Sequence, residues 1–88
     1  MICIITKDRF LSEILPQLQT NTSLEVFIKF CNHQIIYYSN LIDAFTLYQI
    51  DCSVLLMDMI DVIDNYRYFI TVCINEIEVD DVDILAGP

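Results

Sequence analysis

One acidic residue, Asp58, stands at the end of the most apolar run of the chain, where a carboxylate could do chemistry. The four residues before Asp58 are Val-Leu-Leu-Met, and none of them has a polar side chain. Such a run is typical of a central parallel strand, and open α/β sheets bind ligands at the carboxyl ends of these strands. The pattern therefore predicts a buried strand over 52–59 that brings Asp58 to the edge of a sheet.

The other residues that could bind a metal do not form a ligand set that we recognise. The four cysteines are spaced by about twenty residues with no CxxC pair, so a zinc site is not expected. An acidic site around Asp58 would need several further aspartates, but these lack the glycine and final glutamate of an EF-hand loop. The aspartates in question are Asp61, Asp64, Asp80, Asp81 and Asp83. We interpret them as a solvated acidic face, and we expect no metal and no other cofactor.

Catalytic groups of other kinds are also missing. His33 is the only histidine, it falls in a predicted turn, and no serine or cysteine nucleophile is placed beside it. The single glycine, Gly87, cannot form a glycine-rich phosphate loop. We therefore expect that the chain is not an enzyme.

Length and composition limit the organisation of the chain. Its 88 residues have room for one hydrophobic core, so we expect a single domain over 1–88. Hydrophobic residues make up 56 % of the chain, against roughly 45–50 % in an ordinary soluble domain. Two explanations stay open: a tightly packed β-rich core, or apolar surface that a partner covers.

Charge and the apolar runs exclude two classes of partner. The net charge is −9, and four scattered basic residues cannot neutralise a row of phosphates, so these residues should not bind nucleic acid directly. No apolar run approaches 18 residues, and no basic region precedes a long apolar stretch at the start. Cysteines within apolar runs behave as small hydrophobes in a reducing compartment. We expect a cytoplasmic location without a membrane contact.

The order of apolar patterns predicts strands that alternate with helices. Strands are expected over 1–6, 24–30, 34–38, 52–59, 69–74 and 82–85. A helix capped by Asp8 should end or kink near Pro16, the residues 21–23 should form a turn, and a second helix should run from Ser39 or Asn40 to Tyr48. The predicted fold is an α/β open sheet of about five mainly parallel strands with few helices.

This order resembles the receiver domain of bacterial two-component response regulators. In that family a hydrophobic third strand ends in the phosphoacceptor aspartate, and the run over 54–59 is similar to it, with Asp58 at the acceptor position. The stretch 40–44 is similar to the start of the family's second helix, and 69–75 and 83–88 are similar to its last two strands. The resemblance implies a flavodoxin-like sheet and a regulatory role beside a DNA-binding effector region outside this chain.

Departures from the family pattern fall on the positions that the resemblance assigns to phosphoryl transfer. Receivers carry two adjacent acids after the first strand to hold Mg²⁺, where this chain has Thr6 and Lys7, with Asp8 beyond them. The switch serine or threonine falls near Asn75, or at Thr71 in a shifted register, and the lysine after the fifth strand is replaced by Gly87. Asp58 is then a vestigial acceptor, because phosphoryl transfer loses most of its electrostatic support.

The chain is also too short for the family's later helices. Tyr66, Tyr68 and Phe69 stand where a receiver has its third helix, and we expect them to contact a partner. A second copy could cover the exposed sheet, which makes a homodimer the expected assembly. The hypothesis is a phosphorylation-independent regulatory and dimerisation domain of a transcriptional regulator. The alternatives are a receiver phosphorylated on Asp58 and a stand-alone acidic protein-interaction module.

Overall fold

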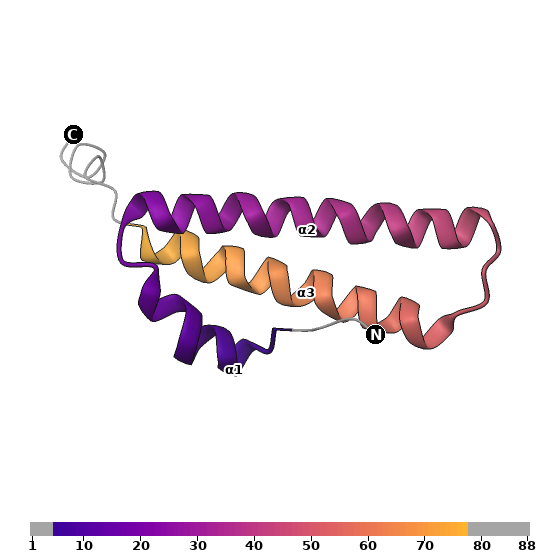
Figure 1. Cartoon of the computed structure of the whole chain (residues 1–88), viewed down its shortest axis with the longest axis horizontal. Coiled ribbons are helices and arrows are strands. Elements are labelled where there is room, and N and C mark those ends of the chain that lie inside the picture. The colour runs from indigo at the N-terminus through magenta and orange to yellow at the C-terminus, as the bar shows by residue number, and fades with distance from the viewer. Residues whose placement is uncertain (1–4, 78–88) are drawn as a thin grey trace, which may run out of the picture.

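The computed structural model describes residues 5–77, and this part of the chain consists of helices without a strand. A short helical segment comes first, made of α1 (Lys7–Arg9), the π-helical η1 (Phe10–Ile14) and the 3₁₀-helical η2 (Leu15–Gln17). Two long helices follow, α2 (Asn21–Leu47) and α3 (Ser53–Glu76), which lie side by side as an antiparallel hairpin (Figure 1). The expected α/β open sheet is therefore wrong.

A seven-residue repeat explains why α2 is a helix. Apolar side chains follow one another at alternating intervals of four and three, a spacing that puts all of them on one stripe of a helix. They are Leu24, Ile28, Cys31, Ile35, Tyr38, Ile42 and Phe45. Leu24 and Cys31 are buried, and the others are partly buried. The strands expected over 24–30 and 34–38 are wrong, because the alternation that predicted the first of them depends on Val26 and Phe30, which are exposed and lie off this stripe.

The same repeat continues in α3 and replaces the strands expected over 52–59 and 69–74. Its members are Leu55, Met59, Val62, Tyr66, Phe69 and Cys73. All of them are buried except Leu55, which is partly buried. We call the two facing stripes the seam. Consecutive residues of the apolar run 54–57 point to different sides of the helix, so only Leu55 lies in the seam. Val54 and Met57 are 74 % and 65 % exposed.

The ends of α2 are fixed by local hydrogen bonds. Thr20 caps its start, because the Thr20 hydroxyl accepts from the backbone N–H of Ser23 and the Ser23 hydroxyl accepts from the backbone N–H of Thr20. The turn expected over 21–23 is therefore wrong. At the other end Gln49 has φ 54°, the backbone N–H of Ile50 donates to Phe45 and that of Gln49 donates to Thr46. These two bonds form a Schellman motif that reverses the chain toward α3.

The N-terminal segment is the part of the fold that the sequence predicted most closely. A helix was expected from Asp8 to near Pro16, and the helical segment ends at Gln17, directly after Pro16. Its cap is Thr6 rather than Asp8, because the Thr6 hydroxyl accepts from the backbone N–H of Arg9 at 3.1 Å. The helix expected up to Tyr48 is also helical, but as the last part of α2. The strand expected over 82–85 lies outside the described residues, as do residues 1–4 of the strand expected over 1–6, and Ile5 and Thr6 do not lie in a strand.

Candidate protein-interaction surface

Phe10 fixes the N-terminal segment to both long helices. Its side chain is fully buried, and its ring stacks on Phe69 of α3 and on Phe27 of α2, with centroids 4.4 Å and 5.6 Å apart. The edges of Tyr66 and Tyr68 meet the ring of Phe69 at 5.7 Å and 6.2 Å. Offset-stacked and edge-on pairs of this kind add to the stabilisation from burial. The aromatic cluster therefore joins three segments that are far apart in the sequence.

The three aromatic residues expected to contact a partner make contacts inside the chain. Phe69 is fully buried and Tyr66 is 8 % exposed, so both belong to the core of the described structure. Tyr68 is partly buried, and the Lys7 ammonium lies 5.0 Å from the centroid of its ring, a cation–π contact. Close by, the Asn65 side-chain amide donates to the backbone carbonyl of Ile5 at 3.1 Å. Together these contacts hold residues 5–10 along one side of α3.

The positions that the receiver resemblance assigned to an acidic pocket do not come together. Asp58 and Asn75 lie on the same helix, 17 residues apart, which separates them by about 25 Å along its axis. Thr6 is the cap of α1, Lys7 lies over a tyrosine ring, and Asp8 is exposed. Gly87 lies outside the described residues. Without a sheet edge to collect these side chains, Asp58 is a partly buried acid on the flank of α3.

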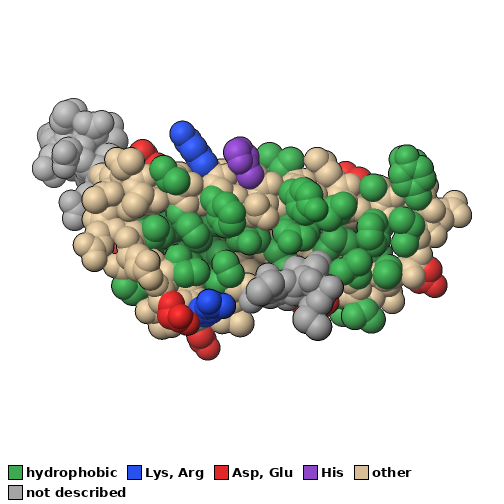
Figure 2. Space-filling model, viewed as in Figure 1, with side chains coloured by type: hydrophobic (Ala, Val, Ile, Leu, Met, Phe, Trp, Pro, Cys, Tyr) green, Lys and Arg blue, Asp and Glu red, His purple; other side chains and the backbone are tan. Residues whose placement is uncertain are grey.

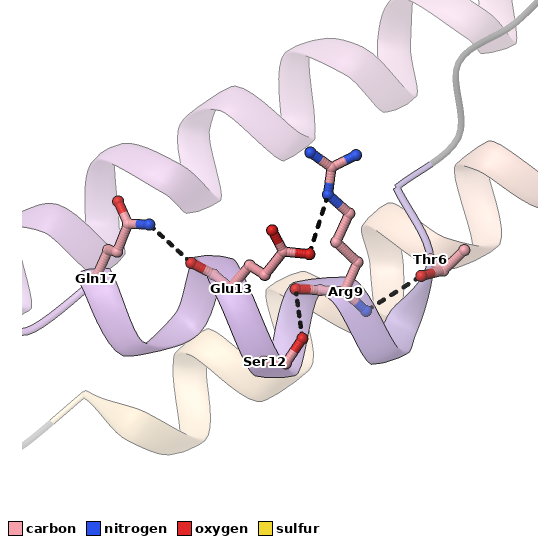
Figure 3. Close-up of polar contacts among 5 residues, drawn as sticks. All are labelled: Thr6, Arg9, Ser12, Glu13 and Gln17. Carbon is pink, nitrogen blue, oxygen red and sulfur yellow. Dashed lines mark hydrogen bonds and ion pairs between the residues drawn. The ribbon is translucent and has the colours of Figure 1, made fainter.

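The exposed positions expected for His33, Asp61 and Asp64 are confirmed, but His33 lies within α2, so the turn in which it was expected is wrong. His33, Asp61 and Asp64 are exposed on the long helices. Within residues 5–77 no three acidic, histidine or cysteine side chains are gathered in a way that could hold a metal ion. The last three aspartates considered for such a site, at 80, 81 and 83, lie outside that range. The polar contacts drawn in Figure 3 lie within the N-terminal segment, and they include the exposed ion pair between Arg9 and Glu13 at 3.5 Å.

The cysteines divide between the seam and the surface. Cys31 and Cys73 are fully buried free thiols, and burial raises the pKa of Cys31 to about 12, with a smaller contribution from the nearby Cys73. Burial also raises the pKa of Cys73. The hydrophobic behaviour expected for Cys73 is thus confirmed, whereas Cys52 is exposed although it begins an apolar run. Cys3 lies outside the described residues.

Exposed apolar side chains lie along the hairpin from Phe30, which contacts Phe27 and Tyr66, to the α2–α3 turn. Phe30, Tyr37 and Tyr48 on α2 and Val54 and Met57 on α3 are 43–74 % exposed. We call these five side chains the aromatic surface. Figure 2 shows hydrophobic side chains continuing along the hairpin from the level of α1 to the turn. The described part of the N-terminal segment packs by Phe10 on the other part of the hairpin, around Phe27 and Phe69.

Helical register places the aromatic surface on the side of the hairpin that binds the N-terminal segment. An interval of 11 residues is close to three turns of an α-helix, so residues 11 apart point to the same side. Val54 is 11 residues before Asn65, which binds Ile5, and Met57 is 11 residues before Tyr68, which contacts Lys7. On α2, Phe30 follows Phe27 by three residues, Tyr37 follows Phe30 by seven, and Tyr48 follows Tyr37 by 11.

Charge near the aromatic surface is of one sign. Between Lys29 and Arg67 the sequence contains no lysine or arginine but five aspartates, at positions 43, 51, 58, 61 and 64. Asp58 and Asp61 follow Val54 by four and seven residues, so they share its side of α3. In Figure 2 acidic side chains lie at the edge of the half nearer the turn, and no basic one is visible there. The aromatic surface is therefore an apolar area with an acidic border.

The opposite end of the hairpin has an open cavity of about 640 Å³ between η2 and the start of α2. Its lining is mainly apolar or amide, and Glu76 is the one titratable side chain in it. A single exposed carboxylate provides neither a nucleophile nor a ligand set. The cavity therefore offers less for recognition than the aromatic surface.

A comparison with protein-family models, curated proteins and solved structures finds no match to the chain. Within residues 5–77, neither long helix has a stretch that is apolar enough to cross a membrane. What the chain does must therefore be argued from its own surface.

Proposed function

We propose that the chain is a non-catalytic, helical protein-interaction module that binds its partner through the aromatic surface. The observation that supports this function most directly is the exposure of five large apolar side chains on one side of the hairpin, Phe30, Tyr37, Tyr48, Val54 and Met57. Contiguous apolar areas with a polar border are typical of binding sites, and aromatic residues and methionine are enriched in them.

The free energies of burial and of association indicate that several side chains of the aromatic surface bind the partner together. Burying one large apolar side chain stabilises a complex by about 1.5–3 kcal/mol, and the lost freedom of two associating molecules costs about 4–15 kcal/mol. Five side chains together offset more of that cost than one or two can. We therefore expect a partner to contact both Tyr37 on α2 and Val54 on α3.

Part of the hypothesis from the sequence carries over to this proposal. The receiver-like sheet is wrong, so a regulatory role based on a phosphoacceptor pocket has no support in the fold. Binding to another protein, either a second copy or a different chain, needs only the exposed aromatic surface. The homodimer and the DNA-binding effector region stay predictions.

A photo-crosslinking experiment tests this function. A photoreactive amino acid replaces Tyr37 or Met57 in the full chain, expressed in its native cells, and Glu25, exposed at the other end of α2, is the control position. We expect an adduct of defined mass at positions 37 and 57 but not at 25, and we expect Val54→Asp to abolish it. Equal labelling at all three positions, or none at any, would contradict the proposal.

A further inference from the structure

The hairpin already binds one helical segment, its own N-terminus, and this contact shows what the side of the hairpin recognises. The segment packs one aromatic ring, Phe10, on both Phe27 and Phe69, and places one cation, Lys7, over the ring of Tyr68. Its backbone is held by the Asn65 amide. The contact therefore combines an apolar anchor with a basic residue about one turn away from it.

Nearer the α2–α3 turn, the corresponding positions on the same side of α3 carry exposed apolar side chains. The residues of α3 that hold the segment, Asn65, Tyr68 and Phe69, have counterparts three turns earlier in Val54, Met57 and Asp58. Two of the counterparts are apolar and strongly exposed, and the third is an acid. A ligand there would meet Val54 and Met57 in place of the amide and the tyrosine ring, and the Asp58 carboxylate in place of the Phe69 ring.

The acidic border determines the sign of the charge that the ligand carries. Asp58 and Asp61 lie on the same side of α3 as Val54, and no basic side chain lies between Lys29 and Arg67 in the sequence. Binding of an acidic ligand would bring like charges together, whereas a basic ligand would be attracted and held in register.

A second copy of the chain fits this border poorly. Each copy has a net charge of −9, and a symmetric contact through the aromatic surface would bring two acidic borders into one interface. Such like-charge contacts cost several kcal/mol. A helix from another protein avoids that cost. From Cys31 to the end of α2 at Leu47 there is room for about 25 Å of helix, roughly four to five turns.

We infer that the partner presents a basic amphipathic helix, which lies along the aromatic surface with its apolar side on Tyr37, Tyr48 and Val54 and its lysines or arginines near Asp58 and Asp61. This inference rests on the proposed function and adds the class of partner to it. Helix-in-groove recognition of this kind places apolar anchors at intervals of three, four and seven residues.

Binding of designed peptides to the full chain tests the inference. The probe is a helix of about sixteen residues with leucine and phenylalanine on one side and lysine on the other. The first comparison peptide replaces each lysine by glutamate, and the second has the composition of the probe in an order that is not amphipathic. We expect the basic amphipathic peptide alone to bind in calorimetry, and its affinity to fall at least about tenfold between low and high salt.

Paired variants assign the binding to the surface. The double variant Tyr37→Ser with Val54→Ser should weaken binding of the basic peptide about tenfold or more, since two anchors are lost. Ile36→Ser with Ile60→Ser is the matched control, because these exposed residues lie on other stripes of α2 and α3. Asp58→Asn with Asp61→Asn should also weaken binding, whereas Asp8→Asn with Glu25→Gln removes the same charge elsewhere and should not. Far-UV circular dichroism checks that each variant stays helical.

The possible results distinguish this inference from the proposed function on which it rests. Equal binding of the basic and acidic amphipathic peptides would overturn the inference and leave an apolar binding surface. A dimer in sedimentation velocity that Tyr37→Ser with Val54→Ser dissociates would identify a second copy as the occupant and would also overturn it. If the non-amphipathic basic peptide binds with the same affinity as the probe, binding depends on net charge alone, and the inference is contradicted. A monomer that binds no peptide would contradict both proposals.

Discussion

Phe10 is the side chain on which the position of the N-terminal segment depends. It is fully buried between rings of α2 and α3, so truncation to alanine leaves a cavity between three helical segments. We expect Phe10→Ala to lower the free energy of unfolding by about 3–5 kcal/mol, measured by urea denaturation. Leu11→Ala is the control, because Leu11 is 41 % exposed, and it should cost less than about 1 kcal/mol. Similar costs for the two variants would contradict this packing.

Cys31 links stability to pH in the alkaline range. Burial raises the pKa of its thiol from 9.0 to about 12, so the unfolded chain loses this proton first as the pH rises. The contribution of the thiol to stability is complete below about pH 9 and is lost progressively as the pH rises toward 12. Urea denaturation at a series of pH values should show a smaller alkaline loss for Cys31→Ala than for the unaltered chain. Parallel curves would show that Cys31 is not buried as described.

Asp58 should not accept a phosphoryl group. It lies on a helix about 25 Å along the axis from Asn75, and the described residues gather no metal-binding set of acids. Incubation with acetyl phosphate and Mg²⁺ should leave the mass of the intact protein unchanged, since nothing neutralises the incoming charge. Asp58→Asn is the control for any modification elsewhere. A phosphoryl adduct that this substitution abolishes would contradict the account of the site.

At the scale of the elements, the turn between α2 and α3 contains a residue that is poorly suited to its backbone. Gln49 has φ 54°, in the left-handed region where a side chain with a Cβ is disfavoured by about 1–2 kcal/mol. We expect Gln49→Gly to raise the free energy of unfolding by about 0.5–1 kcal/mol, because glycine favours this Schellman turn. Gln34→Gly, the same substitution inside α2, should lower it by about 1 kcal/mol. A loss of stability in both variants would show that the turn does not adopt this conformation.

The sequence contained the signal for both long helices, but two features obscured it. The spacing from Leu24 to Phe45 and from Leu55 to Cys73 is a regular alternation of four and three, as in a coiled coil. Val26 and Phe30 lie off the seam and turn part of that pattern into a two-residue alternation, which is the signal of a strand. The β-branched Val26 and the aromatic Phe30 are also residue types enriched in strands, which favoured the same error.

The break at Pro16 was predictable, because proline lacks the N–H that a continuing helix needs.

For the candidate site, the sequence predicted an apolar contact surface but not the residues that form it. Excess hydrophobic composition pointed to a covered surface, and the aromatic residues were expected to make contacts. Which of them stay exposed depends on the hairpin: Tyr66 and Phe69 face α2 and are buried, whereas Tyr37 and Tyr48 lie off the seam. No property of the single residues distinguishes the two pairs.

At the scale of the whole molecule, the N-terminal segment makes the hairpin asymmetric. It packs by Phe10 at the end where α2 begins and α3 finishes, and the aromatic surface lies nearer the turn, where the sequence supplies acids and no bases. Apolar side chains on a stripe outside the seam cannot be buried by a hairpin of two helices. In the proposed complex the helix of the partner covers them, as the N-terminal segment covers Phe27 and Phe69.

The most direct test of this account is to map the binding of the basic amphipathic peptide by amide chemical shifts in the ¹⁵N-labelled full chain. We predict the largest changes at Tyr37, Tyr48, Val54, Met57 and Asp58. Little change is expected at Ser12 and Glu25, or at Ile60 and Ile74 on another side of α3. Shifts concentrated at Ile60 and Ile74, or spread evenly over the acidic residues, would contradict the assignment of the aromatic surface as the binding site.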